Sequence, residues 1–222
     1  MTPWIVLQLA DSAFPAGSFA HSSGVEAAGA LGLIGDGAGA IPLDTLLDQA
    51  LTQAAATSLP FVAAAHAHPA ALAELDALCE AQLLGHVQRR ASRAQGRALT
   101  STARRAFAGD ERVETVTTAA RTTHAHLAPV FGALHRALDV GLDDTLGLFL
   151  HGSLRQTLSA AVRLGHIGPM EAQHLQRARS SALDALRARF GHGDVSRATQ
   201  THPLLDLFAN RHDELDARLF QS

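Results

Sequence analysis

Three titratable side chains near the beginning of the sequence could together perform acid–base chemistry: Asp11, His21 and Glu26. A carboxylate and an imidazole that face one substrate can act as general base and general acid. The sequence contains no Gly-x-Ser-x-Gly nucleophile motif. Its single cysteine, Cys79, lies in an Ala- and Leu-rich stretch that is typical of a buried helix. We therefore predict that the chain is not an enzyme, and we keep the acid–base site as an alternative.

Histidine occurs 13 times, and two His-x-His pairs raise the question of a metal site: His66/His68 and His124/His126. Residues i and i+2 of a helix point about 200° apart, so such a pair can chelate only where the chain is extended or turning. No cysteine or carboxylate completes a ligand set at a recognised spacing. The pattern favours scattered histidines with structural partners over a metal site within the chain.

The 18 basic residues are all arginines, because the sequence contains no lysine. A P-loop needs its lysine to reach the nucleotide phosphates, and a pyridoxal enzyme needs one for its Schiff base. Both classes are therefore excluded. The glycines Gly35, Gly37 and Gly39 lack the spacing of a dinucleotide-binding loop, and we interpret them as a flexible connection.

Four arginines recur at multiples of four positions, which places them on one face of a helix: Arg89, Arg93, Arg97 and Arg105. The preceding segment carries acidic residues such as Glu80. Two interpretations stay open. The arginines form either a solvated face with exposed ion pairs or a docking surface for an acidic partner, to which the planar guanidinium is well suited.

Helices must position these residues, since Ala and Leu dominate and tyrosine is absent. The clearest helix is expected over Leu142–Leu164, where apolar residues recur every four positions. Another is expected from Pro169 to Phe190, with most of its arginines, Arg179 among them, facing outward. Further helices are expected over Pro42–Ser58, Pro60–Ala67, Pro69–Leu84, His86–Phe107, Asp110–Thr123, Pro129–Leu138 and Pro203–Asn210. We predict an all-α, single-domain bundle of about eight to ten helices over residues 1–222.

The segment Leu9–Glu26 is the most irregular part of the predicted bundle. A short apolar helix around Trp4–Leu9 leads into it, and Pro15 and Gly17 then force a turn. Ser18 can cap a new helix that continues to the end of the segment. From composition alone the segment is a helix–helix corner.

Composition also limits the partners and the compartment. The formal net charge of −3 argues against nucleic acid as the main partner, because phosphate binding needs a basic excess. A single cysteine fits a reducing compartment. We see no export signal and no stretch of roughly 18 apolar residues, and we expect a cytoplasmic protein that does not enter membranes.

Several motifs, spread over the whole sequence, resemble the urease accessory protein UreF family. The family's N-terminal signature is matched by Asp11, Ser12, Pro15, Gly17, Phe19, His21, Ser22, Gly24 and Glu26. The resemblance continues through Ser92 with Gly96-Arg97, Pro129–Gly132, Ser159–Gly165 with Arg163, Arg211-His212, and Arg218-Leu219-Phe220 near the C-terminus. Two departures occur: Val25 stands where the family commonly has leucine, and Asp216 where it has tyrosine.

The resemblance implies a non-enzymatic, all-helical homodimer that bridges a UreH-like (UreD-like) protein and a UreG-like GTPase. The assembly would deliver nickel to apo-urease, with GTP bound by the GTPase and nickel passing through as cargo, so that no cofactor is held stably. Candidate partner-binding residues are the signature positions given above together with Arg97, Arg163, Arg211, His212, Arg218, Leu219 and Phe220.

The C-terminal residues 211–222 are expected to form a mobile tail that a UreH-like partner captures. The tail is rich in charge and ends in an apolar Leu219-Phe220 hook next to Arg218. A different hypothesis is a metallochaperone that binds nickel directly through its histidines.

Overall fold

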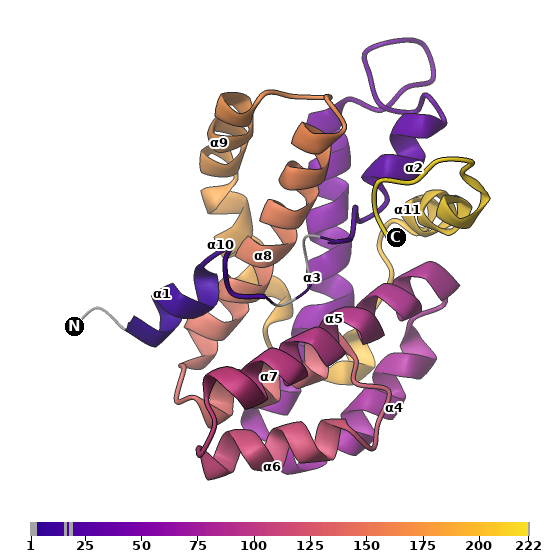
Figure 1. The fold of residues 1–222 in the computed structure, drawn as a ribbon. Coiled ribbons are helices and arrows are strands. Elements are labelled where there is room, and N and C mark those ends of the chain that lie inside the picture. Colours follow the sequence, from indigo (N-terminus) through magenta and orange to yellow (C-terminus); the bar gives the residue numbers. More distant parts are fainter. Residues whose placement is uncertain (1–3, 16, 18–19, 222) are drawn as a thin grey trace.

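The computed structural model describes residues 4–15, 17 and 20–221, and it folds them into eleven α-helices joined by short connections (Figure 1). Within these residues the only β pairing is an isolated bridge between Ile34 and Ile41. The helices are α1 (Trp4–Ala10), α2 (Val25–Ala30), α3 (Leu43–Ala67), α4 (Leu72–Gln82), α5 (His86–Ala106), α6 (Glu111–Ala120), α7 (Leu127–Ala137), α8 (Leu142–Arg163), α9 (Pro169–Ala178), α10 (Ser180–Phe190) and α11 (Pro203–Asn210). The predicted all-α class is confirmed, and the helices slightly exceed the expected number.

Helix α3 runs through the centre of the molecule and packs against α7, α8 and α10. The prediction of two helices meeting at Pro60 is wrong, because α3 continues through this proline. Proline has no N–H to donate to the carbonyl four residues earlier, which normally breaks a helix. Here the backbone N–H of Thr199 donates to the carbonyl of Ala56 at 3.2 Å. A distant segment thus supplies the missing hydrogen bond.

Helix α8 follows the predicted pattern closely. Leu146, Leu150, Leu154 and Leu158 are all buried along the face that it turns toward α3. The acidic residues of its first turn complement the helix dipole. The regular four-residue spacing therefore predicted both the helix and its buried face.

The single helix predicted from Pro169 to Phe190 is divided at Arg179 into α9 and α10. Arg179 does not face outward as expected: it is buried and donates to Asp44 at 2.6 Å and to Asp48 at 2.8 Å, both on α3. These bonds pull the arginine inward, because a buried guanidinium must be paired. The break in the helix coincides with this anchor.

Helices α4, α5, α6 and α7 form the lower part of the molecule in Figure 1, around a buried polar group. Buried His126, at the start of α7, makes hydrogen bonds to Ser92 of α5 at 3.0 Å and to Glu80 of α4 at 2.7 Å. Asp76 of α4 accepts backbone N–H bonds from His124 and His126. We call Asp76, Glu80, Ser92 and His126 the His126 network; it ties three segments together.

The N-terminal segment differs from its prediction after the turn. Helix α2 begins only at Val25, preceded by Gly24 at φ 87°, so that His21 and Ser22 lie before the helix and Glu26 lies in its first turn. Gly24 takes a left-handed conformation that glycine adopts without strain. The proposed cap, Ser18, lies outside the described residues. No helix in the described part of the chain is long and apolar enough to cross a membrane.

Candidate partner-binding site

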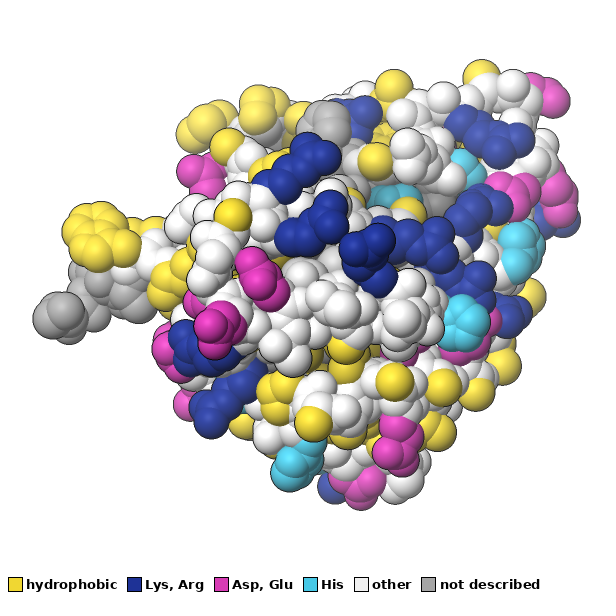
Figure 2. All heavy atoms as spheres, turned by 60° about the horizontal axis from the view of Figure 1, so that its bottom comes forward, with side chains coloured by type: hydrophobic (Ala, Val, Ile, Leu, Met, Phe, Trp, Pro, Cys, Tyr) yellow, Lys and Arg dark blue, Asp and Glu magenta, His cyan; other side chains and the backbone are white. Residues whose placement is uncertain are grey.

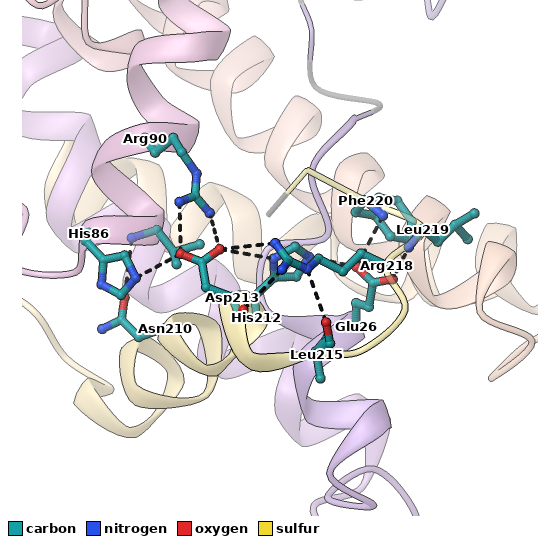
Figure 3. Close-up of polar contacts among 11 residues, drawn as sticks. Glu26, His86, Arg90, Asn210, His212, Asp213, Leu215, Arg218, Leu219 and Phe220 are labelled. Carbon is teal, nitrogen blue, oxygen red and sulfur yellow. Dashed lines mark hydrogen bonds and ion pairs between the residues drawn. The ribbon is translucent and has the colours of Figure 1, made fainter.

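The start of α2 and the C-terminal tail meet at the carboxylate of Glu26 (Figure 3). It accepts a hydrogen bond from Nε2 of His212 at 2.9 Å, and backbone N–H bonds from Leu219 and Phe220. Both side chains of the pair are buried. A buried carboxylate is stable only when its oxygens are satisfied, and here the tail supplies every one of these donors. We call this contact the Glu26 clasp.

A second polar centre lies beside the clasp, at Asp213 (Figure 3). Its carboxylate accepts two hydrogen bonds from Arg90 of α5, at 2.6 and 2.9 Å, and one from His86 at 3.1 Å. Arg218 of the tail lies 3.6 Å away. The bonds from Arg90 hold the pKa of Asp213 down at about 2. The charged form therefore persists at neutral pH and fixes the tail to α5.

The ring of Phe220 makes a further contact between the tail and the helices. It is buried in an apolar cluster with Val25 and Ala160, and the guanidinium of Arg163 lies 4.1 Å from its centroid. Such a cation–π contact adds to the apolar burial. The next residue, Gln221, donates its N–H to the carbonyl of Ala20 at 2.8 Å. The aromatic hook thus lies against the N-terminal segment.

His21 is buried close to this junction. Its pKa is lowered to about 4, chiefly by burial and further by the charges of Arg90 and His212. The imidazole is therefore neutral at pH 7. Among the predicted residues, His21 and Glu26 of the N-terminal signature lie at the tail together with Arg163, His212, Arg218, Leu219 and Phe220. Gly24 lies against Ala209 of α11, and Ser22 is buried. Leu219 and Arg218 remain exposed.

The residues at the start of the N-terminal signature make contacts away from the tail. The side chain of Asp11 accepts the backbone N–H of Ala13, which stabilises a local turn that includes Ser12. The carbonyl of Pro15 accepts a hydrogen bond from Thr102 of α5. Gly17 has φ 80°, and a Cβ at that position would lie 2.9 Å from the side chain of Ala98. Phe19 lies outside the described residues.

Arg97 and Arg211 lie apart from the clasp. Arg97 is exposed on α5 and lines a groove between α5 and α6. Arg211 is exposed at the start of the tail, where it makes an ion pair with Glu214 at 2.7 Å. The structure therefore separates the predicted residues into one large cluster, one N-terminal turn and two outlying arginines.

The geometry does not support the acid–base alternative. A cavity of about 370 Å³ has Asp11 and His21 among its lining residues, together with Phe61 and Phe149, but Glu26 is not among them. The carboxylate of Glu26 is occupied by the tail, and that of Asp11 by its own turn. The three groups do not face one substrate position.

One histidine of each His-x-His pair has structural partners in the described chain. His126 uses both ring nitrogens in its network, and Nε2 of His66 bonds to the carbonyl of Val140 at 2.8 Å. Among residues 4–15, 17 and 20–221, no three His, Cys, Asp or Glu side chains lie together as metal ligands would. Direct nickel binding gains no support from this arrangement.

Arg90 and Asp213, which hold the tail against α5, lie outside the matched motifs and were not identified from the sequence. Arg90 stands beside the predicted arginine stripe, and Asp213 directly follows the matched Arg211-His212 pair. A charged residue at each place was a weak signal on its own. Their pairing depends on a fold that brings α5 next to the tail.

The structure places the tail against the chain's own helices. Residues Arg211–Glu214 form a short 3-10 helix, and His212 and Phe220 are both buried against the chain's own helices. The Glu26 clasp joins the tail to a residue far away in the sequence, which the motifs did not predict, and the mobility of the tail stays a prediction. Capture of the tail by a partner stays a prediction.

Comparisons with known proteins agree with the motif pattern. The family model for UreF matches residues 41–179. A protein from Arabidopsis thaliana named urease accessory protein F is 33% identical over 99% of this chain and 92% of its own length. Its counterpart from Oryza sativa subsp. indica is 32% identical over 98% and 84%, and urease accessory protein UreF of Arthrobacter sp. (strain FB24) is 31% identical over 97% and 95%. This chain belongs to the UreF family.

Proposed function

We propose that the chain serves urease maturation as a non-catalytic scaffold and adaptor. In this role it bridges a UreH-like (UreD-like) protein and a UreG-like GTPase, so that nickel reaches apo-urease. Membership of the UreF family supports a place among the urease accessory proteins. The observation that carries the adaptor role is the Glu26 clasp, which uses the signature residues of both chain ends to hold a shape.

Three further elements belong to this proposal. Nickel is cargo of the assembly, and GTP is bound by the partner GTPase, whose rate the adaptor can modulate. The chain acts as a homodimer in the cytoplasm. The exposed residues Arg218 and Leu219 lie beside the clasp, and exposed Arg211 lies at the start of the tail; all three are available to a partner protein. Exposed arginine and leucine side chains beside a rigid centre are suited to such a contact.

Co-expression with the UreH-like and UreG-like proteins tests the adaptor role. The full chain should co-purify with both partners and support urease activation, and a chain without residues 211–222 should support neither. A Glu214→Gln variant is the matched control, because Glu214 is an exposed tail residue that pairs only with Arg211 among the described contacts. Normal urease activation by the truncated chain would contradict the assignment of the tail.

Equilibrium dialysis with nickel separates the adaptor from a metallochaperone. The isolated chain is expected to bind nickel only weakly. Stoichiometric binding with a submicromolar dissociation constant would favour the metallochaperone instead.

Limited proteolysis tests the capture of the tail by the UreH-like partner. The tail should be cut more slowly in the complex than in the isolated chain. Equal sensitivity in both would count against capture.

A further inference from the structure

The arginines of α5 fall into two groups that differ in their partners. Arg89 and Arg93 make ion pairs with Glu80, and Arg90 makes its pair with Asp213. Further along the same helix, Arg97 and Arg104 are exposed, and the structure describes no acidic side chain within ion-pair distance of either. The first group stabilises the fold, whereas the second carries charge that no described carboxylate neutralises.

A third arginine faces the same place from the neighbouring helix. Arg121, at the C-terminal cap of α6, lines a groove of about 220 Å³ together with Arg97 and Arg104. It too is exposed, and no described residue makes an ion pair with it. Figure 2 shows basic side chains gathered in a band on this side of the molecule, with acidic side chains mainly toward the ends of the band.

The floor of the groove is made of small side chains. Thr100, Thr117, Ala120 and Ala125 are buried there, and the hydroxyl of Ser101 is exposed at the rim. The hydroxyls of Thr100 and Thr117 already donate to backbone carbonyls of their own helices. The floor can therefore receive a backbone without steric conflict, while the arginines and Ser101 provide the free hydrogen-bond donors.

The spacing of the arginines selects the shape of the ligand. Arg97 and Arg104 are seven residues apart on α5, which is about 10 Å along the axis of a helix. Three residues of a segment in the extended polyproline II conformation span about 9 Å, and because this conformation has three residues per turn, side chains at i and i+3 lie on the same side. Carboxylates three residues apart in an extended segment would thus match the two guanidinium groups, and guanidinium forks bind carboxylates in a bidentate manner. A nucleic acid is less suitable, because the chain as a whole is acidic, with a net charge of −3.

We propose that the groove between α5 and α6 binds an extended, carboxylate-bearing segment of a partner protein through Arg97, Arg104 and Arg121. This surface is separate from the Glu26 clasp, and its binding of such a segment does not depend on the role proposed for the tail. Attraction between the unneutralised arginines and an acidic segment would also accelerate encounter at low salt.

Fluorescence polarisation with the full chain tests the inference. The probe is a labelled twelve-residue peptide with glutamate at every third position and glycine and serine between. The Arg97→Gln/Arg104→Gln/Arg121→Gln variant is expected to bind it about tenfold more weakly, since three charge-assisted contacts are lost. The matched control is Arg105→Gln/Arg136→Gln/Arg177→Gln, which removes the same charge from exposed residues outside the groove and should bind within about twofold of the original chain.

Two competitors and a second peptide complete the test. A peptide of the same composition with adjacent glutamates should bind several-fold more weakly, and inorganic phosphate or a single-stranded oligonucleotide should not displace the probe at equal charge concentration. No binding of the probe would overturn the inference, as would an equal loss in both triple variants. Equal affinity of the two peptides, or displacement by phosphate or oligonucleotide, would also overturn it.

Discussion

The molecule contains two glutamate–histidine pairs with a buried histidine, which have nearly the same length and very different surroundings. Glu80 and His126 are 2.7 Å apart, among α4, α5 and α7, and Glu80 also accepts hydrogen bonds from Arg89 and Arg93. Glu26 and His212 are 2.9 Å apart, and their additional bonds come from the tail backbone. The first pair joins helices in the middle of the chain, whereas the second joins the tail to α2.

The two pairs are therefore expected to have different roles: the first stabilises the fold, and the second holds the tail in place. Loss of the Glu80–His126 pair disturbs three packed segments at once, and their unfolding is cooperative. Loss of the Glu26–His212 pair frees a terminal segment that can detach while the helices remain folded. The same chemistry therefore supports the fold at one place and a releasable contact at the other.

The largest expected effect comes from His126→Ala. The substitution leaves a cavity and removes one hydrogen-bond partner each from Ser92 and Glu80, so we expect the free energy of unfolding to fall by about 3 kcal/mol. Chemical denaturation followed by circular dichroism measures it. A change below about 1 kcal/mol would show that the His126 network contributes little.

The matching change at the tail is His212→Ala. We expect a global loss of less than about 1 kcal/mol, because the tail can undock without unfolding the helices. The backbone amides of Leu219 and Phe220 should exchange hydrogen faster by roughly tenfold, since about 1–2 kcal/mol of local docking energy is lost. Hydrogen exchange measured by mass spectrometry of C-terminal peptides reports this. Unchanged exchange there would mean that the clasp does not hold the tail.

Acid should affect His21, beside the clasp, and Glu80, in the His126 network, at different pH. Because the folded-state pKa of His21, next to the clasp, is lowered from 6.5 to about 4, its contribution to stability is present above pH 6.5 and is lost as the pH falls toward 4. Hydrogen bonds from Arg93 lower the pKa of Glu80 from 4.5 to about 2, so its contribution is lost only between pH 4.5 and 2.

Proteolysis of the tail between pH 7 and 4 measures the effect of His21, and this pH dependence should become weaker in a His21→Gln variant. Thermal unfolding between pH 5 and 2 measures the effect of Glu80, and its pH dependence should become weaker in a Glu80→Gln variant. If the tail of the His21→Gln chain shows the same pH dependence as the original, His21 does not govern the clasp.

The smallest effect is expected for Arg211→Gln. Arg211 and Glu214 are both more than half exposed, and such ion pairs contribute less than about 0.5 kcal/mol. Thermal unfolding and hydrogen exchange of the tail should both remain unchanged. A clear destabilisation would indicate that Arg211 takes part in the clasp, although it lies outside it in the structure.

Sequence patterns predicted the parts of the fold that depend on neighbouring residues. The leucines of α8 and the buried face that they form were evident from their spacing. The buried position of Arg179 was not, because it depends on Asp44 and Asp48, which α3 brings from elsewhere in the chain. Local pattern carries no information about such partners.

The candidate site shows the same division. The signature indicated that Glu26 and His212 matter, but not that they touch, since 186 positions separate them. A charged residue near the start of a helix is expected to be exposed to solvent, unless a partner that pairs with it is known. Only the packing of α2 against α11 and the tail turns the two motifs into one buried pair.

The hydrogen bond from Thr199 to the carbonyl of Ala56 also bears on the order in which the protein folds. During synthesis α3 emerges early, with the carbonyl of Ala56 left unsatisfied by Pro60, and Thr199, which satisfies it, is made much later. Contacts so distant in sequence slow folding and delay completion of the native state. The central helix of the bundle therefore reaches its final form only when the chain has been made beyond Thr199.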